Sequence, residues 1–253
     1  MTFFSDTWVV FTRAMKLSLR EPLWVVIGIT QPILYLTLFG PLLEQVASAP
    51  GFPPGDAWVV FVPGLLVQLG IFGGLFVGFG IITEWRAGVI DRMMVTPASR
   101  TALITGRVLR DVVVLIVQAV ILIACAYLFG LRVPFWAVAV GLVLIGLLGA
   151  AFSYLSYAFG LITKNEDAFA PLVNSLALPV LLLSGILLPM SLAPQWLQVL
   201  SNINPFKHVV DALRAIFRGE IGTPEALFGL ALAVVLVALG AWFGNRVFEG
   251  QTR

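Results

Sequence analysis

Six long apolar stretches constrain the fold of this chain more than any other feature of its sequence. A helix that crosses about 30 Å of hydrocarbon needs roughly 20 mostly apolar residues. The stretches that meet this requirement are 23–43, 59–83, 108–129, 135–162, 168–188 and 227–245. With 60% hydrophobic and 11% charged residues, the chain has too few charged side chains to coat a water-soluble protein. The sequence therefore predicts an all-α membrane protein with six transmembrane helices in a lipid bilayer.

The positions of lysine and arginine predict which helix ends face the cytoplasm. Cytoplasmic loops carry an excess of these residues, and the loop 44–57 has none. With both termini cytoplasmic, eleven of the fifteen fall in inner segments: Arg13, Lys16, Arg20, Arg86, Arg92, Arg100, Arg107, Arg110, Lys164, Arg246 and Arg253. The net charge of +2 is too small to indicate a nucleic-acid partner. We therefore expect a multi-pass protein with both termini in the cytoplasm.

Residues 1–22 precede the first predicted span and have the pattern of an amphipathic helix. On a helical wheel the apolar side chains share one face and the charged ones lie opposite: Phe4, Trp8, Phe11 and Met15 against Asp6, Arg13, Lys16 and Arg20. We expect an interfacial helix lying flat on the inner leaflet, with its cations toward anionic headgroups. The alternative is a hydrophilic leader. Because charges interrupt the apolar positions, no cleavable signal peptide is expected.

Glycine recurs every four residues in the second predicted span, at Gly70, Gly74 and Gly78. Such a row of missing side chains lets another helix approach closely. We interpret it as a helix-packing face, with a pore lining or a hinge as the alternative.

The segment 84–107 forms the longest predicted cytoplasmic loop. Val89, Ile90, Met93 and Met94 have helical spacing, and Pro97 stops the short helix. An apolar stripe on an exposed loop needs a partner. The partner is either another protein or, if the helix lies flat, the lipid surface.

The segment 189–224, between the fifth and sixth spans, is predicted to lie outside the cell. Pro189, Pro194 and Pro205 divide it into two amphipathic pieces, 195–200 and 206–218, which are too short to cross the membrane. We expect an extracellular helical hairpin that forms a lid or a re-entrant structure.

Several kinds of chemistry are missing from the sequence. None of the three lysines follows a glycine, so the chain has no phosphate-binding loop. One histidine, His208, and one cysteine, Cys125, cannot build the usual zinc site or a histidine-containing triad. Asp111 follows Arg107 by four residues, which favours an interfacial ion pair over an ion-coupling site. We expect no catalytic, metal or cofactor site in this chain.

Two segments resemble the signatures of one family. The run Glu84-Trp85-Arg86-Ala87-Gly88-Val89-Ile90-Asp91-Arg92-Met93-Met94-Val95-Thr96-Pro97 is similar to the motif that follows the second span in ABC-2-type exporter permeases. The outer segment agrees through Pro189, Trp196, Asn204-Pro205-Phe206 and Asp211-Ala212-Leu213-Arg214. The chain departs from the family pattern at Ala87 and Val89. The similarity covers nearly the whole chain, with the daunorubicin-resistance-like permeases of bacteria as the nearest branch.

This resemblance implies an ABC-2-type transmembrane domain over 23–253 that works as a dimer in a bacterial plasma membrane. Two cytoplasmic ATP-binding-cassette subunits would hold the ATP and Mg, and 84–97 would be the coupling helix that meets them. The residues assigned to this coupling are Glu84, Arg86, Gly88, Val89, Ile90, Asp91, Arg92, Met93, Met94 and Pro97.

The resemblance implies export of a lipophilic or amphiphilic compound, such as a drug, an antibiotic or a lipid. An exporter of lipid-linked glycans shares the same frame, but phenylalanine outnumbers tyrosine and tryptophan here, which favours an apolar cargo. A non-transporting membrane scaffold or a channel is the alternative from a different class.

Overall fold

The structure is a computed structural model that describes residues 3–46, 56–96, 99–186 and 189–250. The described residues form helices and no strands. The helices are α1 (Phe3–Arg20), α2 (Leu23–Val46), α3 (Ala57–Leu75), α4 (Val77–Arg86), α5 (Val89–Met94), α6 (Arg100–Leu128), α7 (Phe135–Thr163), α8 (Glu166–Leu183), the 3-10 turn η1 (Met190–Leu192), α9 (Gln195–Ile203), α10 (Pro205–Phe217) and α11 (Pro224–Gly250).

Six of these segments are long and apolar enough to cross a membrane, as the sequence predicts. They are Leu23–Leu43, Ala57–Arg86, Arg100–Leu128, Phe135–Thr163, Glu166–Leu183 and Pro224–Gly250. The all-helical six-span fold is therefore confirmed. The second span combines α3 and α4, and it is the most deeply buried of the six.

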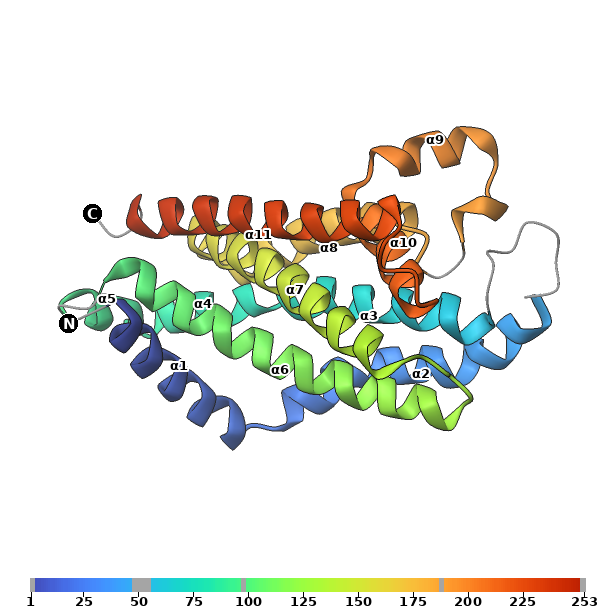
Figure 1. The fold of residues 1–253 in the computed structure, drawn as a ribbon. Coiled ribbons are helices and arrows are strands. Elements are labelled where there is room, and N and C mark those ends of the chain that lie inside the picture. The colour runs from blue at the N-terminus through green and yellow to red at the C-terminus, as the bar shows by residue number, and fades with distance from the viewer. Residues whose placement is uncertain (1–2, 47–55, 97–98, 187–188, 251–253) are drawn as a thin grey trace.

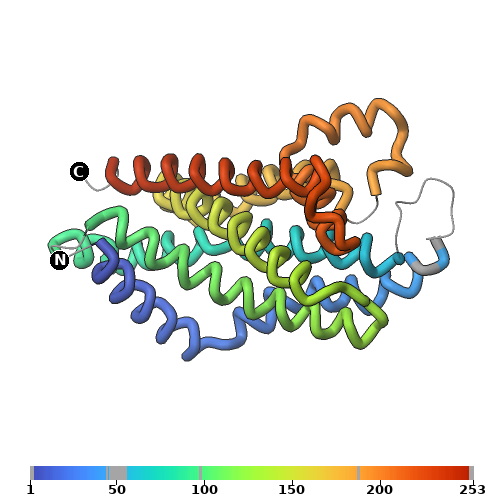
Figure 2. Tube along the Cα trace, viewed as in Figure 1, coloured from blue at the N-terminus to red at the C-terminus, as the bar shows by residue number. Residues whose placement is uncertain are grey.

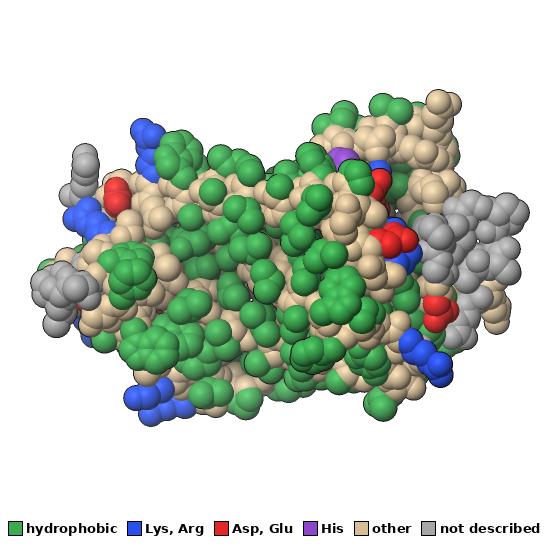
Figure 3. Space-filling model, in the orientation of Figure 1, with side chains coloured by type: hydrophobic (Ala, Val, Ile, Leu, Met, Phe, Trp, Pro, Cys, Tyr) green, Lys and Arg blue, Asp and Glu red, His purple; other side chains and the backbone are tan. Residues whose placement is uncertain are grey.

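The spans run back and forth along one axis, and both ends of the chain lie at the same end of the bundle (Figures 1 and 2). That end also holds α5, whereas α9 and α10 lie at the opposite end. In Figure 3, acidic and basic side chains gather toward the two ends, and apolar side chains cover the wide band between them. This distribution suits a bundle whose middle lies in hydrocarbon.

Several span ends differ from the sequence prediction, and two of these differences change a connection near the bundle ends. The helix α6 begins at Arg100, because the Ser99 side chain accepts a hydrogen bond from the Ala102 amide at 3.1 Å and caps the helix. The connection that follows the second span is therefore 87–99, shorter than the predicted 84–107. The helix α8 ends at Leu183, five residues before the predicted end, and Gly185 then turns the chain with φ +67°.

The second span is interrupted between Leu75 and Val77, and a side chain from α7 fills the break. The Gly78 amide donates to Ser156 Oγ at 2.9 Å, and the Ser156 hydroxyl donates to the Leu75 carbonyl. Ser156 thus satisfies two backbone groups that the interrupted helix leaves without their usual partners.

The N-terminal segment forms the predicted helix, but Asp6 does not lie on an exposed polar face. Asp6, Thr7 and Val10 are buried. Asp6 Oδ2 accepts a hydrogen bond from the Ser99 amide at 3.3 Å. Helical periodicity separates apolar from charged positions, but it does not show which side packs on the bundle. The position of α1 relative to a membrane stays a prediction.

Candidate functional site

The turn from α4 into α5 depends on a glycine. Gly88 has φ +65°, a conformation that side chains with a Cβ rarely adopt. No atom lies within 4 Å of the position that a Cβ would occupy there, so the backbone conformation and not crowding favours glycine. The tight turn brings α5 back toward the end of the bundle.

The apolar stripe on α5 faces the chain itself, which corrects the interpretation of an exposed stripe. Ile90 is 3% exposed, and Met93 and Met94 pack against the same apolar cluster. That cluster takes one or more residues from each of α1, α4, α5, α6, α7 and α11, as its buried members show: Val10, Ile81, Ile90, Leu103, Ile104, Val108, Tyr154, Tyr157, Leu161 and Phe248. We call this cluster the α5 socket.

The other side of α5 is exposed. Asp91 and Arg92 are exposed, and Val95 just after the helix is 87% exposed. Pro97 lies outside the described residues. The exposed side of α5 therefore carries one acidic and one basic side chain, followed by the apolar Val95.

Arg107 joins three helices beside the α5 socket. Its Nη2 atom lies 2.5 Å from Glu84 Oε2 on α4 and donates to Met93 Sδ on α5 at 3.3 Å. Arg107 is 6% exposed. Glu84 therefore forms an ion pair within the chain, and α5 is tied to α4 and α6 by one guanidinium group.

Asp111 has a different partner from the one that its spacing predicts. Arg110 Nε lies 3.2 Å from Asp111 Oδ1, and the Tyr157 hydroxyl donates to Asp111 Oδ2 at 2.5 Å. The interpretation of an Arg107–Asp111 pair is wrong, because Arg107 turns toward Glu84. Tyr157 is a buried member of this cluster that the sequence reasoning did not assign, and its spacing gave no signal of a contact with α6.

Arg86 lies at the edge of the same end and pairs with the start of α8. Its Nη1 atom is 3.5 Å from Glu166 Oε1, and both side chains are about half exposed. Such an exposed pair contributes little to stability, so Arg86 remains accessible to a partner.

The glycines Gly70, Gly74 and Gly78 face α7. A Cβ on Gly74 would lie 2.5 Å from Phe152 Cβ and 2.8 Å from the Gly149 carbonyl oxygen. Near Gly70 the closest atoms belong to Leu148 and Ile145, also on α7. The row therefore lets the second span and α7 of one chain pack closely. Its effect on assembly or transport stays a prediction.

At the opposite end, Arg214 holds α10 to two other segments. Its Nε donates to the Val60 carbonyl at 2.9 Å, and its Nη2 donates to the Gly185 carbonyl at 2.7 Å. Burial lowers the pKa of Arg214 to about 10, and Asp211, at 3.6 Å from Nη1, partly opposes this shift.

The two short helices that the sequence predicts in this segment are present as α9 and α10. Pro205 is the first residue of α10, Pro189 precedes η1, and Trp196 is 68% exposed. Whether they form a hairpin on the extracellular side stays a prediction.

Comparison with known proteins decides the family. The family model described as ABC-2 type transporter matches residues 5–217, most of the chain and both ends of the bundle just described. The chain belongs to the ABC-2 type transporter family. The match includes α5, the segment that holds Arg214 and every buried residue of the α5 socket except Phe248.

Several curated proteins are similar to this chain. The daunorubicin resistance ABC transporter permease protein DrrB1 of Streptomyces coeruleorubidus is 23% identical over 99% of this chain and 88% of its own. The putative transport permease ycf38 of Cyanophora paradoxa is 25% identical over 85% of this chain and 75% of its own. The probable multidrug ABC transporter permease YbhR of Escherichia coli is 28% identical, over 63% of this chain and 44% of its own. These similarities support a transport permease.

Proposed function

We propose that this chain is the membrane-spanning subunit of an ATP-binding-cassette exporter that moves a lipophilic or amphiphilic compound. The ATP is hydrolysed by a separate cytoplasmic subunit. Membership of the ABC-2 family and two relatives named for drug resistance or multidrug transport support this function. The sequence has no phosphate-binding loop of its own.

The observation that best supports the proposal is the way α5 packs against the bundle. A force applied by a moving partner reaches the spans only through a stiff element with contacts on both sides. Ile90 fills the α5 socket, and Arg107 ties the same helix to α4 and α6. Asp91, Arg92 and Val95 remain exposed for a partner. The helix thus has one side for docking and one side for transmission.

The test is reconstitution of the permease with an ATP-binding-cassette subunit from the same genome. The pair is purified through a tag on the permease and placed in lipid vesicles. ATP-dependent accumulation of daunorubicin and of a neutral fluorescent lipid is then measured. We expect transport, and ATP hydrolysis stimulated by the permease, only when both chains are present in the vesicles.

A variant of the ATPase subunit that lacks its phosphate-binding lysine is the control, and it should form the complex without transport. Hydrolysis of ATP by the permease alone would contradict the proposal. A stable, ATP-hydrolysing complex that moves neither type of compound would contradict the assignment to lipophilic cargo.

A further inference from the structure

The helix α1 has three distinct faces, and one of them is committed to the bundle. Val10 and Thr7 pack on α6 where Gly106 leaves room, since a Cβ there would lie 2.8 Å from both the Thr7 carbonyl oxygen and Val10 Cβ. Asp6 fixes the same face to the Ser99 amide. The N-terminal part of α1 is therefore held near the end of the bundle that carries α5, and the helix slants away from that end toward the start of α2 (Figure 1).

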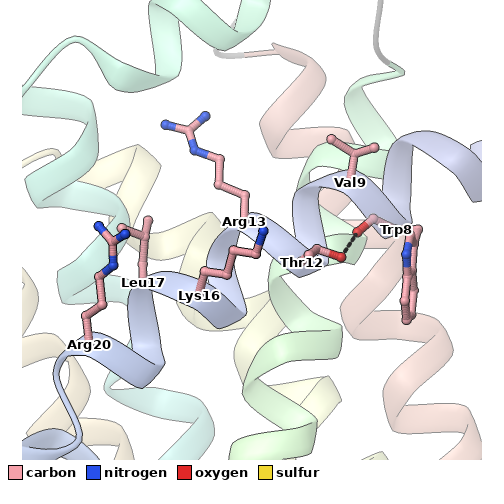
Figure 4. A pocket seen from close by; sticks show the side chains of 7 residues that line it. All are labelled: Trp8, Val9, Thr12, Arg13, Lys16, Leu17 and Arg20. Atoms are coloured by element: carbon pink, nitrogen blue, oxygen red, sulfur yellow. Dashed lines mark hydrogen bonds between the residues drawn. The ribbon is translucent and has the colours of Figure 1, made fainter.

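The second face is cationic. Arg13, Lys16 and Arg20 are exposed and line a shallow hollow along α1. The hollow is completed by Trp8, Val9, Thr12 and Leu17 (Figure 4). The lining includes no acidic residue.

These three cations differ from most others in the described part of the chain. There, Arg86, Arg107, Arg110, Lys207, Arg214 and Arg218 form ion pairs. Lys164 and Arg246 lie over tryptophan rings at 5.0 and 5.4 Å. No ion pair within the described residues involves Arg13, Lys16 or Arg20. Three uncompensated positive charges on one helix face favour an anionic partner.

The third face of α1 is apolar and exposed, which decides the kind of partner. Phe4 is 83% exposed, Trp8 63% and Leu19 72%. A protein that binds only the cationic face would leave these side chains uncovered. A bilayer covers both faces at once, because acyl chains take up the apolar side chains while headgroups meet the cations. Trp8 lies at the boundary between the two faces, and tryptophan prefers the headgroup level.

We propose that the cationic face of α1 binds the headgroup of an anionic phospholipid, with the lipid phosphate between Lys16 and its neighbours Arg13 and Arg20. The site discriminates by charge, so zwitterionic phospholipids bind it less well. Each basic residue near an anionic lipid surface strengthens binding about fivefold. This inference does not depend on ATP or on the transported compound.

The test is titration of the purified full-length permease in detergent, followed by native mass spectrometry. The probes are dioleoylphosphatidylglycerol and dioleoylphosphatidylcholine. The double variant Lys16→Gln with Arg20→Gln is compared with Arg132→Gln with Arg218→Gln, which removes the same charge outside α1. We expect the wild type to prefer phosphatidylglycerol, the α1 variant to bind it roughly 30-fold more weakly, and the control variant to keep the preference.

Equal binding of the two lipids by the wild type would overturn the proposal, as would an equal loss in both variants. An unchanged lipid preference in the α1 variant, together with weaker capture of the ATP-binding-cassette subunit, would assign the face to a protein partner instead. The exchange Lys16→Arg with Arg20→Lys keeps the charge and should retain the preference. If the double variant does not purify as a folded protein, Lys16→Gln alone decides the question, with about a fivefold loss expected.

Discussion

Gly74 and Gly80 stand on either side of the break in the second span, yet only Gly74 contacts another helix. A Cβ on Gly74 would meet Phe152 and the backbone of Gly149, whereas no atom lies within 4 Å of one on Gly80. Backbone atoms cannot move aside as a flexible side chain can. The same residue type therefore has opposite tolerance to substitution at two nearby positions.

We expect Gly74→Leu to destabilise the protein by about 3 kcal/mol or more and to reduce transport, because it separates α3 from α7. Gly80→Leu should have little effect on either property. Thermal unfolding in detergent and vesicle transport measure both variants. Equal stability of the two would mean that Gly74 does not lie in a tight helix contact.

Arg107 and Arg86 offer a second matched comparison, since each pairs with a glutamate but only Arg107 is buried. Arg107→Gln should cost about 2 kcal/mol, because it removes charged hydrogen bonds to Glu84 and Met93. Arg86→Gln should cost less than about 1 kcal/mol. The same unfolding assay measures both, and a larger effect of Arg86→Gln would contradict the role of Arg107 in holding α5.

The helix α5 is the element whose position the sequence predicts least completely. Spacing places Val89, Ile90, Met93 and Met94 on one face. The structure packs Ile90, Met93 and Met94 in the cluster, whereas Val89 is half-buried and lies outside it. A helical wheel cannot show what covers this face, and here the cluster that includes Ile90 takes residues from five other helices. Arg107 likewise has two acids within reach, and only the folded arrangement selects Glu84 over Asp111. The spans, in contrast, are predictable because length and apolarity alone decide them.

Substitutions on the two sides of α5 should affect different steps of transport. Ile90→Ala leaves a cavity in the α5 socket and should cost about 2–4 kcal/mol. The permease would still bind its ATPase subunit but would transport less per ATP hydrolysed. Arg92→Glu reverses an exposed charge and should weaken binding of the ATPase subunit without changing the stability of the lone permease.

Co-purification, ATP hydrolysis and transport separate these two outcomes, and Arg132→Glu serves as the exposed control outside α5. Loss of binding in Ile90→Ala with full binding in Arg92→Glu would reverse the assignment of the two sides.

The whole molecule places both chain ends together, with α9 and α10 at the opposite end (Figure 1). Most basic residues lie in segments near the end that holds the termini, which predicts that this end is cytoplasmic. The orientation is a property of the complete set of loops and cannot be assigned from a single one.

Reporter fusions in a bacterial host test this orientation. A fluorescent protein fused to either terminus should fluoresce, and alkaline phosphatase inserted after Gly219, between α10 and α11, should be active. Alkaline phosphatase fused to either terminus should be inactive, and a fluorescent protein inserted after Gly219 should not fluoresce. Active phosphatase at either terminus would show that the orientation is reversed.

The break in the second span means that this span depends on another helix for its structure. The residues at the break are Leu75, Phe76 and Val77, none of which is proline or glycine. The hydroxyl that bonds to the backbone on both sides of the break belongs to Ser156 on α7. Residues 57–86 transferred into a foreign bundle would therefore not keep the interrupted shape of this span, because a side chain of a different helix supplies the hydrogen bonds that stabilise it.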